Sequence, residues 1–231
     1  MDIQNLELTA VARIHTGFPS KFGIPRQSGL VDTEGKIIFE PSFRNPDMLR
    51  GIEEYSHLWI LWGFSESMGK EWHPTVRPPR LGGNQRMGVF ATRSPFRPNP
   101  VGLSCVKLEK ADLDNSGGPV LWVTGADMMD GTPIYDIKPY LSYADSIPEA
   151  SGGFSDRVRE YALAVDFPER WMKVVPEAER KRLIQILSQD PRPSYQNDPG
   201  RVYGMEYAGM EIKFRVGNGR LTVCEVTCIK K

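Results

Sequence analysis

The segment from Trp72 to Cys105 restricts the fold of this chain more than any other part of the sequence. It contains five arginines and no Asp or Glu, although the whole chain has 29 basic and 29 acidic residues and no net charge. Proline stands at positions 74, 78, 79, 95, 98 and 100. Because proline lacks a backbone donor and clashes with the preceding helical turn, most of this segment cannot be helical. We expect a stiff, basic, irregular segment with one short strand at 87–92.

The sequence on both sides of this segment is typical of β-structure. The run HLWILWGF at 57–64 is short and uniformly apolar, which predicts a strand buried on both faces. Strands are also predicted in the second half of 6–15, at about 101–110 and 119–126, and shortly after the Asp130-Gly131 turn. A long loop, GFPSKFGIPRQSG, follows the first of them. The first part of the chain is therefore expected to be predominantly β.

Helices are expected only after this β part. Ser155 is predicted to cap a helical stretch through DRVREYALAV, and a second helix is predicted from Pro176-Glu177 to about Ser188. Asn218-Gly219 is the turn of a predicted hairpin. We therefore expect a mainly β fold in two units. These are a β domain at 1–147 and a smaller α+β C-terminal domain, with helices and a β-hairpin, at 148–231.

Composition and residue spacing disfavour several classes of protein. The balanced charge gives no global field that would mark binding to nucleic acid or membranes, so any polyanion site must be local. No Cys-x-x-Cys pair is present and the histidines have no metal-ligand spacing, so we expect no metal site and a cytoplasmic protein. The longest apolar run, Leu58 to Phe64, is too short to cross a membrane. Without a G-x-G-x-x-G motif, a nucleotide-binding Rossmann fold is disfavoured.

The arginines of the basic segment allow two interpretations. Their planar guanidinium groups can hold carboxylates or phosphates in a fixed geometry on a backbone stiffened by proline. Alternatively, they solvate a long loop and pair with acidic residues elsewhere, since surface ion pairs are common and weak. The residues alone leave both interpretations open. The five are Arg77, Arg80, Arg86, Arg93 and Arg97.

The turn at Asp130–Pro133 and the strand after it carry a second group of candidates. Gly131 would let a ligand approach the main chain, and Asp130 could face a ribose hydroxyl or a cation. Asp-Gly between two β runs is equally well an ordinary hairpin turn. Alternation along the strand would place Asp136, Lys138 and Tyr140 on one face, which is either a site or a solvated edge.

Five sequence blocks, taken together, resemble one known family. In chain order they are IPRQSG, YSHLWILW, RPPRLGGNQRMGVFATRSPFRPNPVGLS, DGTPIYDIKPYL and QDPRPSY, which cover most of 20–143 and an island at 189–195. They resemble the TsaA-like family, the TrmO tRNA N6-methyltransferases. The resemblance implies a single-sheeted β-barrel catalytic domain and a homodimer with cofactor sites near the subunit contact. It also implies S-adenosylmethionine as methyl donor and N6-threonylcarbamoyladenosine, beside the tRNA anticodon, as substrate.

The resemblance assigns roles to residues at matching positions. Residues 65 and 66 are expected to contact the cofactor through their main chain. The implied cofactor contacts are Pro25, Arg26, Gln27, Ser65, Glu66, Arg93, Asp130, Gly131, Thr132 and Pro133. The substrate carries a carboxylate and phosphates, so its binding site needs cationic side chains. The bases of the single-stranded anticodon loop can stack on Phe96, Trp72 or Tyr140. The residues expected to bind the tRNA anticodon arm are Arg77, Arg80, Arg86, Arg97, Asp190, Arg192 and Tyr195.

Catalysis is expected to depend mainly on positioning, because methyl transfer needs an in-line arrangement of acceptor, methyl group and sulfur. The acceptor nitrogen must lose a proton, and Asp136 and Tyr140 are the candidate bases, with Lys138 holding a carboxylate.

Two rival functions remain open. The first is a tRNA-binding or regulatory module of the same fold without methyl transfer. The second, a hydrolase acting on nucleotides, lacks a convincing pair of nucleophile and base.

Overall fold

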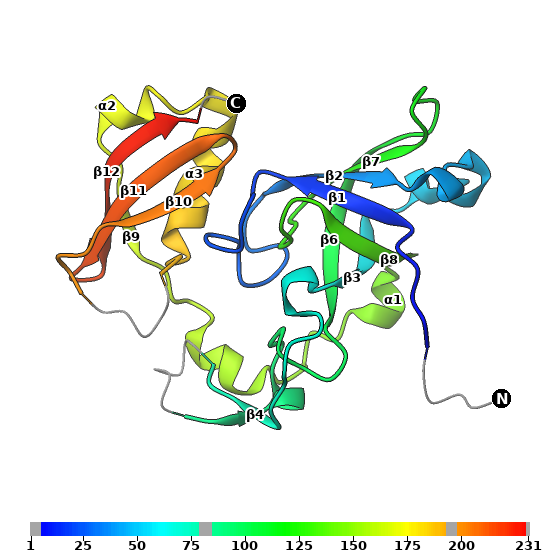
Figure 1. Cartoon of the computed structure of the whole chain (residues 1–231), viewed down its shortest axis with the longest axis horizontal. Coiled ribbons are helices and arrows are strands. Elements are labelled where there is room, and N and C mark those ends of the chain that lie inside the picture. Colours follow the sequence, from blue (N-terminus) through cyan, green and yellow to red (C-terminus); the bar gives the residue numbers. More distant parts are fainter. Residues whose placement is uncertain (1–5, 79–84, 193–197, 230–231) are drawn as a thin grey trace.

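The computed structural model describes residues 6–78, 85–192 and 198–229 (Figure 1). Its first part is a closed barrel of six strands, each antiparallel to both neighbours. This confirms the barrel implied by the resemblance. In order round the barrel, the strands are β1 (Ala12–Thr16), β2 (Glu34–Phe39), β7 (Val120–Thr124), β6 (Val101–Asp112), β3 (His57–Gly63) and β8 (Thr132–Pro139).

Only the inner face of the barrel is buried, so the prediction that the strand at 57–64 is buried on both faces is wrong. In β3 the side chains of Leu58, Ile60 and Trp62 point into the core, whereas the residues between them are only half-buried. Successive side chains of a strand point to opposite faces, and in a barrel only the inner face is closed. The apolar outer residues of β3 therefore lie on the surface of the barrel.

Two further segments of the barrel part differ from the sequence prediction. The strand β2 was not predicted, although its Ile37 and Phe39 are buried in the barrel core. The strand predicted at 87–92 is reduced to β5 (Met87–Gly88), which pairs with β4 (Thr75–Val76) and is followed by a 3-10 turn. A two-residue pairing is all that the surrounding prolines leave room for.

The ends of the barrel strands fall into two groups. Because all neighbours are antiparallel, β1, β3 and β7 finish at the end where β2, β6 and β8 begin, called here the site end. The connection 125–131 leads from β7 to β8, which are three strands apart in either direction round the barrel. It therefore crosses the site end. The Asp130-Gly131 turn is not a hairpin turn, because the two strands it joins do not pair.

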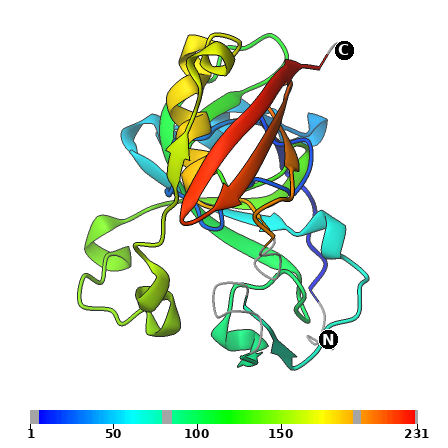
Figure 2. The same cartoon turned by 90° about the vertical axis from the view of Figure 1, so that its left-hand side faces the viewer.

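The C-terminal part is a four-stranded sheet with helices packed against it (Figures 1 and 2). Its strands in order are β10 (Tyr203–Tyr207), β11 (Met210–Gly217), β12 (Arg220–Cys228) and β9 (Ala164–Asp166). The helix predicted from Pro176 to Ser188 is confirmed as α3 (Glu177–Ser188), and Asn218 and Gly219, with φ of 51° and 72°, form the predicted hairpin turn.

The prediction of a helix after Ser155 is wrong. A 3-10 helix spans Gly153–Val158, and Ala164–Asp166 forms β9, parallel to β12. Pairing with the edge of β12 gives this segment backbone partners that its helical pattern did not reveal. The remaining short helices are Pro41–Phe43, Pro46–Leu49, Ile52–Glu54, Ser65–Ser67, Val89–Ala91, α1 (Ser142–Asp145) and α2 (Glu169–Met172).

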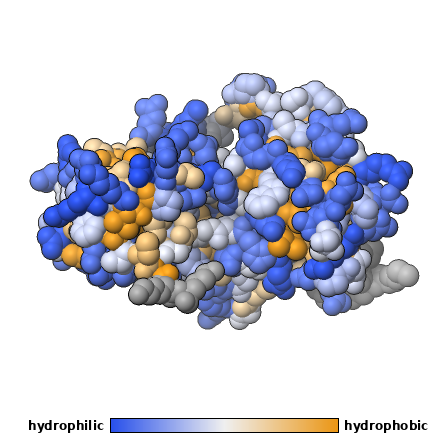
Figure 3. All heavy atoms as spheres, turned by 90° about the horizontal axis from the view of Figure 1, so that it is seen from above, coloured by the Kyte–Doolittle hydropathy of each residue, from blue (hydrophilic) through white to orange (hydrophobic). Residues whose placement is uncertain are grey.

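The buried residues form two clusters, one inside the barrel and one between the C-terminal sheet and α3. Phe18 and Val31, from the loop after β1, belong to the C-terminal cluster, so this loop lies between the two parts (Figure 1). Seen from above, both parts are mostly hydrophilic with scattered apolar patches (Figure 3). We propose that the chain divides near residue 147, and the two clusters support this division.

Candidate functional site

The site end of the barrel gathers the residues predicted to bind the cofactor. Pro25–Gln27 lie in the loop after β1, Ser65 and Glu66 directly follow β3, and Arg93 precedes β6. Asp130–Pro133 lie where the crossing connection enters β8. The alternation of strand directions brings these four segments together, although they are spread over more than 100 positions, from 25 to 133, of the sequence.

A direct contact joins two of the predicted segments. Arg93 Nη1 donates a hydrogen bond to Gln27 Oε1, across 66 residues of sequence. Arg26 lies beside Gln27 and donates from Nη2 to the backbone oxygen of Asp190 at 3.4 Å. Pro25 is buried, whereas Arg26 and Gln27 are half-buried. This end therefore carries the guanidinium groups of Arg26 and Arg93, and such groups are suited to binding an anion.

Asp127, on the crossing connection, was missed by the sequence analysis. Its half-buried carboxylate accepts hydrogen bonds from Ser104 Oγ at 2.6 Å and from the backbone N–H of Ser28. Burial raises its pKa above the usual range, although the hydrogen bonds and the nearby Arg93 guanidinium act in the opposite direction. A signal was present in the sequence, because Asp127 is the one charged residue between Val120 and Met129.

The Asp130–Pro133 turn is fixed by its own backbone. The N–H groups of Asp130 and Gly131 donate to the oxygens of Phe18 and Ile14 at 2.8 and 2.9 Å. These groups are therefore occupied, and reading of an adenine edge by them is not supported. The Asp130 carboxylate accepts from His15 Nδ1 and from the N–H of Thr16, both at 3.1 Å, and its side chain is 46% exposed. What this turn offers a ligand is a carboxylate.

The turn after β3 is exposed and lies beside a tyrosine that was also missed. Glu66 forms an ion pair with Lys21 at 3.5 Å. A Cβ at Gly63 would lie 2.5 Å from the hydroxyl of Tyr135, so this hydroxyl reaches over the end of β3. The register of β8 against β3 shifts at this point, and the irregularity places Tyr135 without a partner residue. Such a bulge cannot be read from alternation alone.

The predicted catalytic residues lie away from the site end. Asp136 and Lys138 share the outer face of β8, as predicted, and form an ion pair at 2.8 Å. The ring of Tyr140 lies beyond β8, 5.8 Å from that of Trp59. Asp136 and Lys138 line a hollow of about 340 Å³, with Phe39, Phe43, Tyr55 and other residues. Within one chain, therefore, the predicted catalytic and cofactor sets do not meet.

Three of the described arginines of the basic segment donate hydrogen bonds to neutral oxygen atoms. In the part of the chain that the structure describes, no ion pair is formed by Arg77, Arg86, Arg93 or Arg97. Arg86 contacts Thr75 Oγ1 at 3.4 Å and Arg97 the backbone oxygen of Thr92 at 3.1 Å. Among the described residues, these contacts leave most donors of the two guanidinium groups unused, which disfavours the interpretation as paired surface charges. Arg80 lies outside the described residues.

Asp190 and Arg192 form an internal ion pair. Arg192 donates from Nε and Nη2 to the two carboxylate oxygens at 2.8 and 2.9 Å, and the side chains are 11% and 10% exposed. Tyr161 also donates to Asp190 at 2.7 Å. Burial raises the pKa of Asp190, but the hydrogen bonds from Arg192 and Tyr161 outweigh it, so the pKa lies below the usual range. This geometry favours a structural role over RNA contact; Tyr195 lies outside the described residues.

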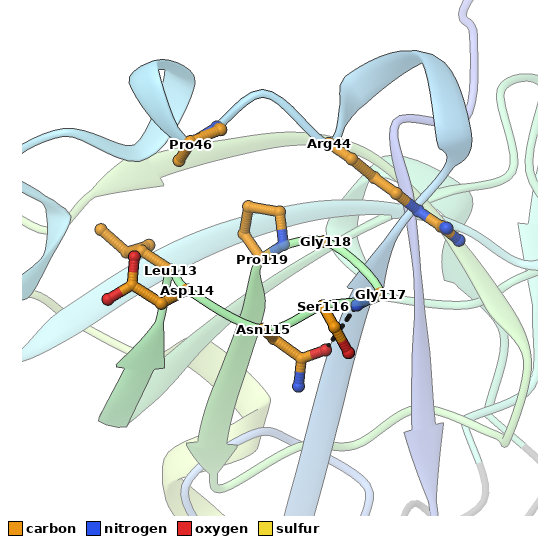
Figure 4. Close-up of a pocket in the computed structure, with 9 residues that line it drawn as sticks. All are labelled: Arg44, Pro46, Leu113, Asp114, Asn115, Ser116, Gly117, Gly118 and Pro119. Carbon is orange, nitrogen blue, oxygen red and sulfur yellow. Dashed lines mark hydrogen bonds between the residues drawn. The ribbon is translucent and has the colours of Figure 1, made fainter.

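A second hollow, of about 430 Å³, lies at the end of the barrel opposite the site end (Figure 4). It is formed by the turn between β6 and β7, where Asn115 Oδ1 accepts from the N–H of Gly117, and by Arg44. No predicted site residue lines it. Among the described residues, no cluster of His, Cys, Asp and Glu could hold a metal ion, and no helix has the length and hydropathy to cross a membrane.

Comparison with known proteins identifies the family. The model of the tRNA-methyltransferase O N-terminal domain matches residues 13–146, and that of the TrmO C-terminal domain matches residues 160–229. The chain is 38% identical over 223 residues to a tRNA (adenine(37)-N6)-methyltransferase of Escherichia coli, with 93% of this chain and 94% of that protein covered.

Two further matches come from Pseudomonas aeruginosa. A putative S-adenosylmethionine-dependent methyltransferase is 38% identical over 214 residues, with 89% of this chain and 90% of that protein covered. A crystal structure of TrmO matches with a TM-score of 0.78 and 31% identity, covering 98% of this chain and 99% of that chain. Sequence and fold agree over nearly the whole length, and the chain belongs to the TrmO family of tRNA methyltransferases.

Proposed function

We propose that this chain transfers the methyl group of S-adenosylmethionine to N6 of adenosine 37 in tRNA, and that the acceptor is N6-threonylcarbamoyladenosine. Methylation at N6 of adenine 37 is the reaction in the name of the E. coli relative. The observation that carries the proposal is the gathering of Arg26, Gln27, Arg93 and the acidic crossing connection at one end of the barrel. We place this activity in the cytoplasm, where tRNA is modified.

The residues at the site end fit the methyl donor. S-adenosylmethionine supplies an electrophilic methyl group on a cationic sulfur and also carries an amino acid group and an adenosine. The guanidinium groups of Arg26 and Arg93 suit the carboxylate, and the exposed carboxylate of Asp130 suits a positive charge or a ribose hydroxyl. Holding two reactants in line can supply about 7 to 11 kcal/mol of the activation barrier.

The tRNA is proposed to bind along the basic segment. Arg77 directly follows β4 and Arg86 directly precedes β5, so both arginines flank this strand pair, where they can contact phosphates. Exposed aromatic side chains lie in the same segment: Trp72 is 46%, Phe90 80% and Phe96 45% exposed. Guanidinium groups interleaved with aromatic rings suit a single-stranded anticodon loop, whose bases can stack.

A homodimer would reconcile the two separated sets of residues. We propose that Asp136, Lys138 and Tyr140 of one copy act at the site end of the other. The outer face of β3 and β6, beside Asp136, exposes 56% of Leu103, and Leu61, which pairs with it, is only half-buried. Mixing an inactive Asp136→Ala variant with an inactive Arg93→Ala variant should restore activity. Mixtures that stay inactive, although the copies exchange, would contradict shared sites.

The function itself is tested by two measurements. Isothermal calorimetry should show binding of S-adenosylmethionine to the purified protein, whereas a pure tRNA-binding module would give no heat with this ligand. Mass spectrometry of tRNA from a deletion strain should then show threonylcarbamoyladenosine that lacks one methyl group, and the gene should restore it. Fully methylated tRNA in the deletion strain would contradict the proposal.

A further inference from the structure

The carboxylate of Asp127 joins most of the segments that meet at the site end. Its partners come from β6 through Ser104, from the loop after β1 through Ser28, and from the basic segment through the charge of Arg93. Asp127 itself stands in the connection that crosses this end of the barrel. No other described carboxylate lies among these segments with so many partners drawn from different parts of the chain.

We propose that Asp127 is a positioning residue of the methyl-donor site, which holds Arg93 and the loop at Ser28 in the arrangement that binds the donor. The inference rests on the proposed function. It adds to the proposed function a role for Asp127, a residue that is not among the predicted cofactor contacts.

The direction of the hydrogen bonds shows that this carboxylate acts as an acceptor. Trp62 Nε1 can only donate, and it donates to Ser104 Oγ at 2.9 Å. The hydroxyl of Ser104 must then use its own proton toward Asp127, at 2.6 Å. The N–H of Ser28 is also a donor. Both named donors, Ser104 and Ser28, and the charge of the Arg93 guanidinium favour the ionised form, so Asp127 brings a negative charge to the site end.

A purely structural role does not explain why an ionised carboxylate stands at position 127. Withdrawing a carboxylate from water is unfavourable, and burial raises the pKa of Asp127 in spite of its donors. A carboxyl group whose pKa is raised in the folded protein lowers the stability of the fold at neutral pH, where the group is ionised. An Asn of the same shape would avoid this penalty. What Asn cannot do is attract the Arg93 guanidinium, whose Nη1 reaches Gln27 beside the donor site.

The first test is the variant Asp127→Asn, measured by calorimetry with S-adenosylmethionine and by thermal unfolding. We expect the affinity to fall about tenfold or more, as for loss of a charged partner, with a melting temperature that is unchanged or higher. Asp145→Asn is the matched control. Like Asp127, Asp145 accepts from one side chain and one backbone N–H, here Trp59 Nε1 at 2.9 Å and Leu141 at 2.8 Å, but it lies beyond β8. Its affinity for the donor should stay unchanged.

A double-mutant cycle separates positioning from a general effect on the fold. If Asp127 acts through Arg93, the variant with both Asp127→Asn and Arg93→Ala should bind the donor no more weakly than Arg93→Ala alone. Additive losses would overturn the inference, and so would binding by Asp127→Asn within about twofold of the natural protein. If the variant fails to fold, Ser104→Ala should still weaken binding several-fold, because it removes a donor to Asp127, together with the acceptor of Trp62 Nε1. Unchanged binding there would overturn the inference. If the natural protein binds no donor, the proposed function fails first.

Discussion

The ring of Phe18, in the loop after β1, packs against the ring of Tyr207 in β10 with centroids 5.0 Å apart and an interplanar angle of 45°. Beside this contact, the N–H of Ala208 donates to the oxygen of Gly17 at 2.8 Å. Further along the same loop, Arg182 of α3 donates from Nε to the oxygen of Asp32 at 3.0 Å. The C-terminal part thus holds both ends of the loop that carries Pro25–Gln27.

Gly17→Ala should disturb this junction, because a Cβ at Gly17 would lie 2.8 Å from Tyr207 Cε2. Overpacking against a buried ring is expected to cost about 1 to 3 kcal/mol in the free energy of unfolding. The loop should shift with it, so affinity for S-adenosylmethionine should also fall. Urea unfolding and calorimetry measure the two effects. Gly88→Ala is the control, because a Cβ there meets nothing within 4 Å; equal effects of both variants would contradict the prediction.

Asp190→Asn should make the free energy of unfolding less dependent on pH in the acid range. The pKa of Asp190 is lowered in the folded protein, so its contribution is present above the unfolded value of about 3.9 and is lost as pH falls through the folded pKa. Leaving Arg192 without its nearly buried partner should cost about 3 kcal/mol at neutral pH. Asn tolerates the positive φ of 53° at this position, so backbone strain does not confuse the result.

Urea unfolding of both proteins over a pH series checks this prediction. The difference in free energy between the natural protein and Asp190→Asn should shrink below about pH 4. A difference that stays constant with pH would show that Asp190 stabilises through packing and not through its charge.

Arg77→Ala and Arg86→Ala should weaken tRNA binding without changing affinity for S-adenosylmethionine. Each variant removes a guanidinium that forms no ion pair with another described residue. Each should therefore reduce the slope of the logarithm of the tRNA binding constant against the logarithm of the salt concentration by about one unit. Filter binding at several salt concentrations measures the slope. Lys110→Ala is a suitable control, because Lys110 pairs with Asp112 at 3.6 Å on another part of the barrel. An unchanged slope for the arginine variants would remove them from the tRNA surface.

Asp136→Ala should lower kcat on modified tRNA while donor affinity stays unchanged. If its carboxylate accepts the proton of the acceptor nitrogen, the loss should be about 10² to 10⁴-fold. Lys138, its partner at 2.8 Å, offers a comparison, since Lys138→Ala leaves the carboxylate in place. Full turnover by Asp136→Ala would eliminate this residue as the base and leave Tyr140 as the remaining candidate.

Local signals in the sequence were sufficient wherever one segment decides its own structure. Pro176-Glu177 opens α3, Asn218-Gly219 turns the hairpin, and the prolines of the basic segment exclude a helix there. The sequence blocks also pointed to the barrel and to the family. These features depend on backbone preferences and residue order, which are present before the chain folds.

Tertiary structure alone decided which residues meet. The strand order carries the connection 125–131 across the barrel and makes Asp127, an isolated acid in an apolar run, the partner of Ser104. Pairing with β12 turned a predicted helix into β9. Asp136 and Lys138 were correctly placed on one face, but which way that face points depended on closure of the barrel. Such contacts join residues far apart in the sequence, so no local pattern contains them.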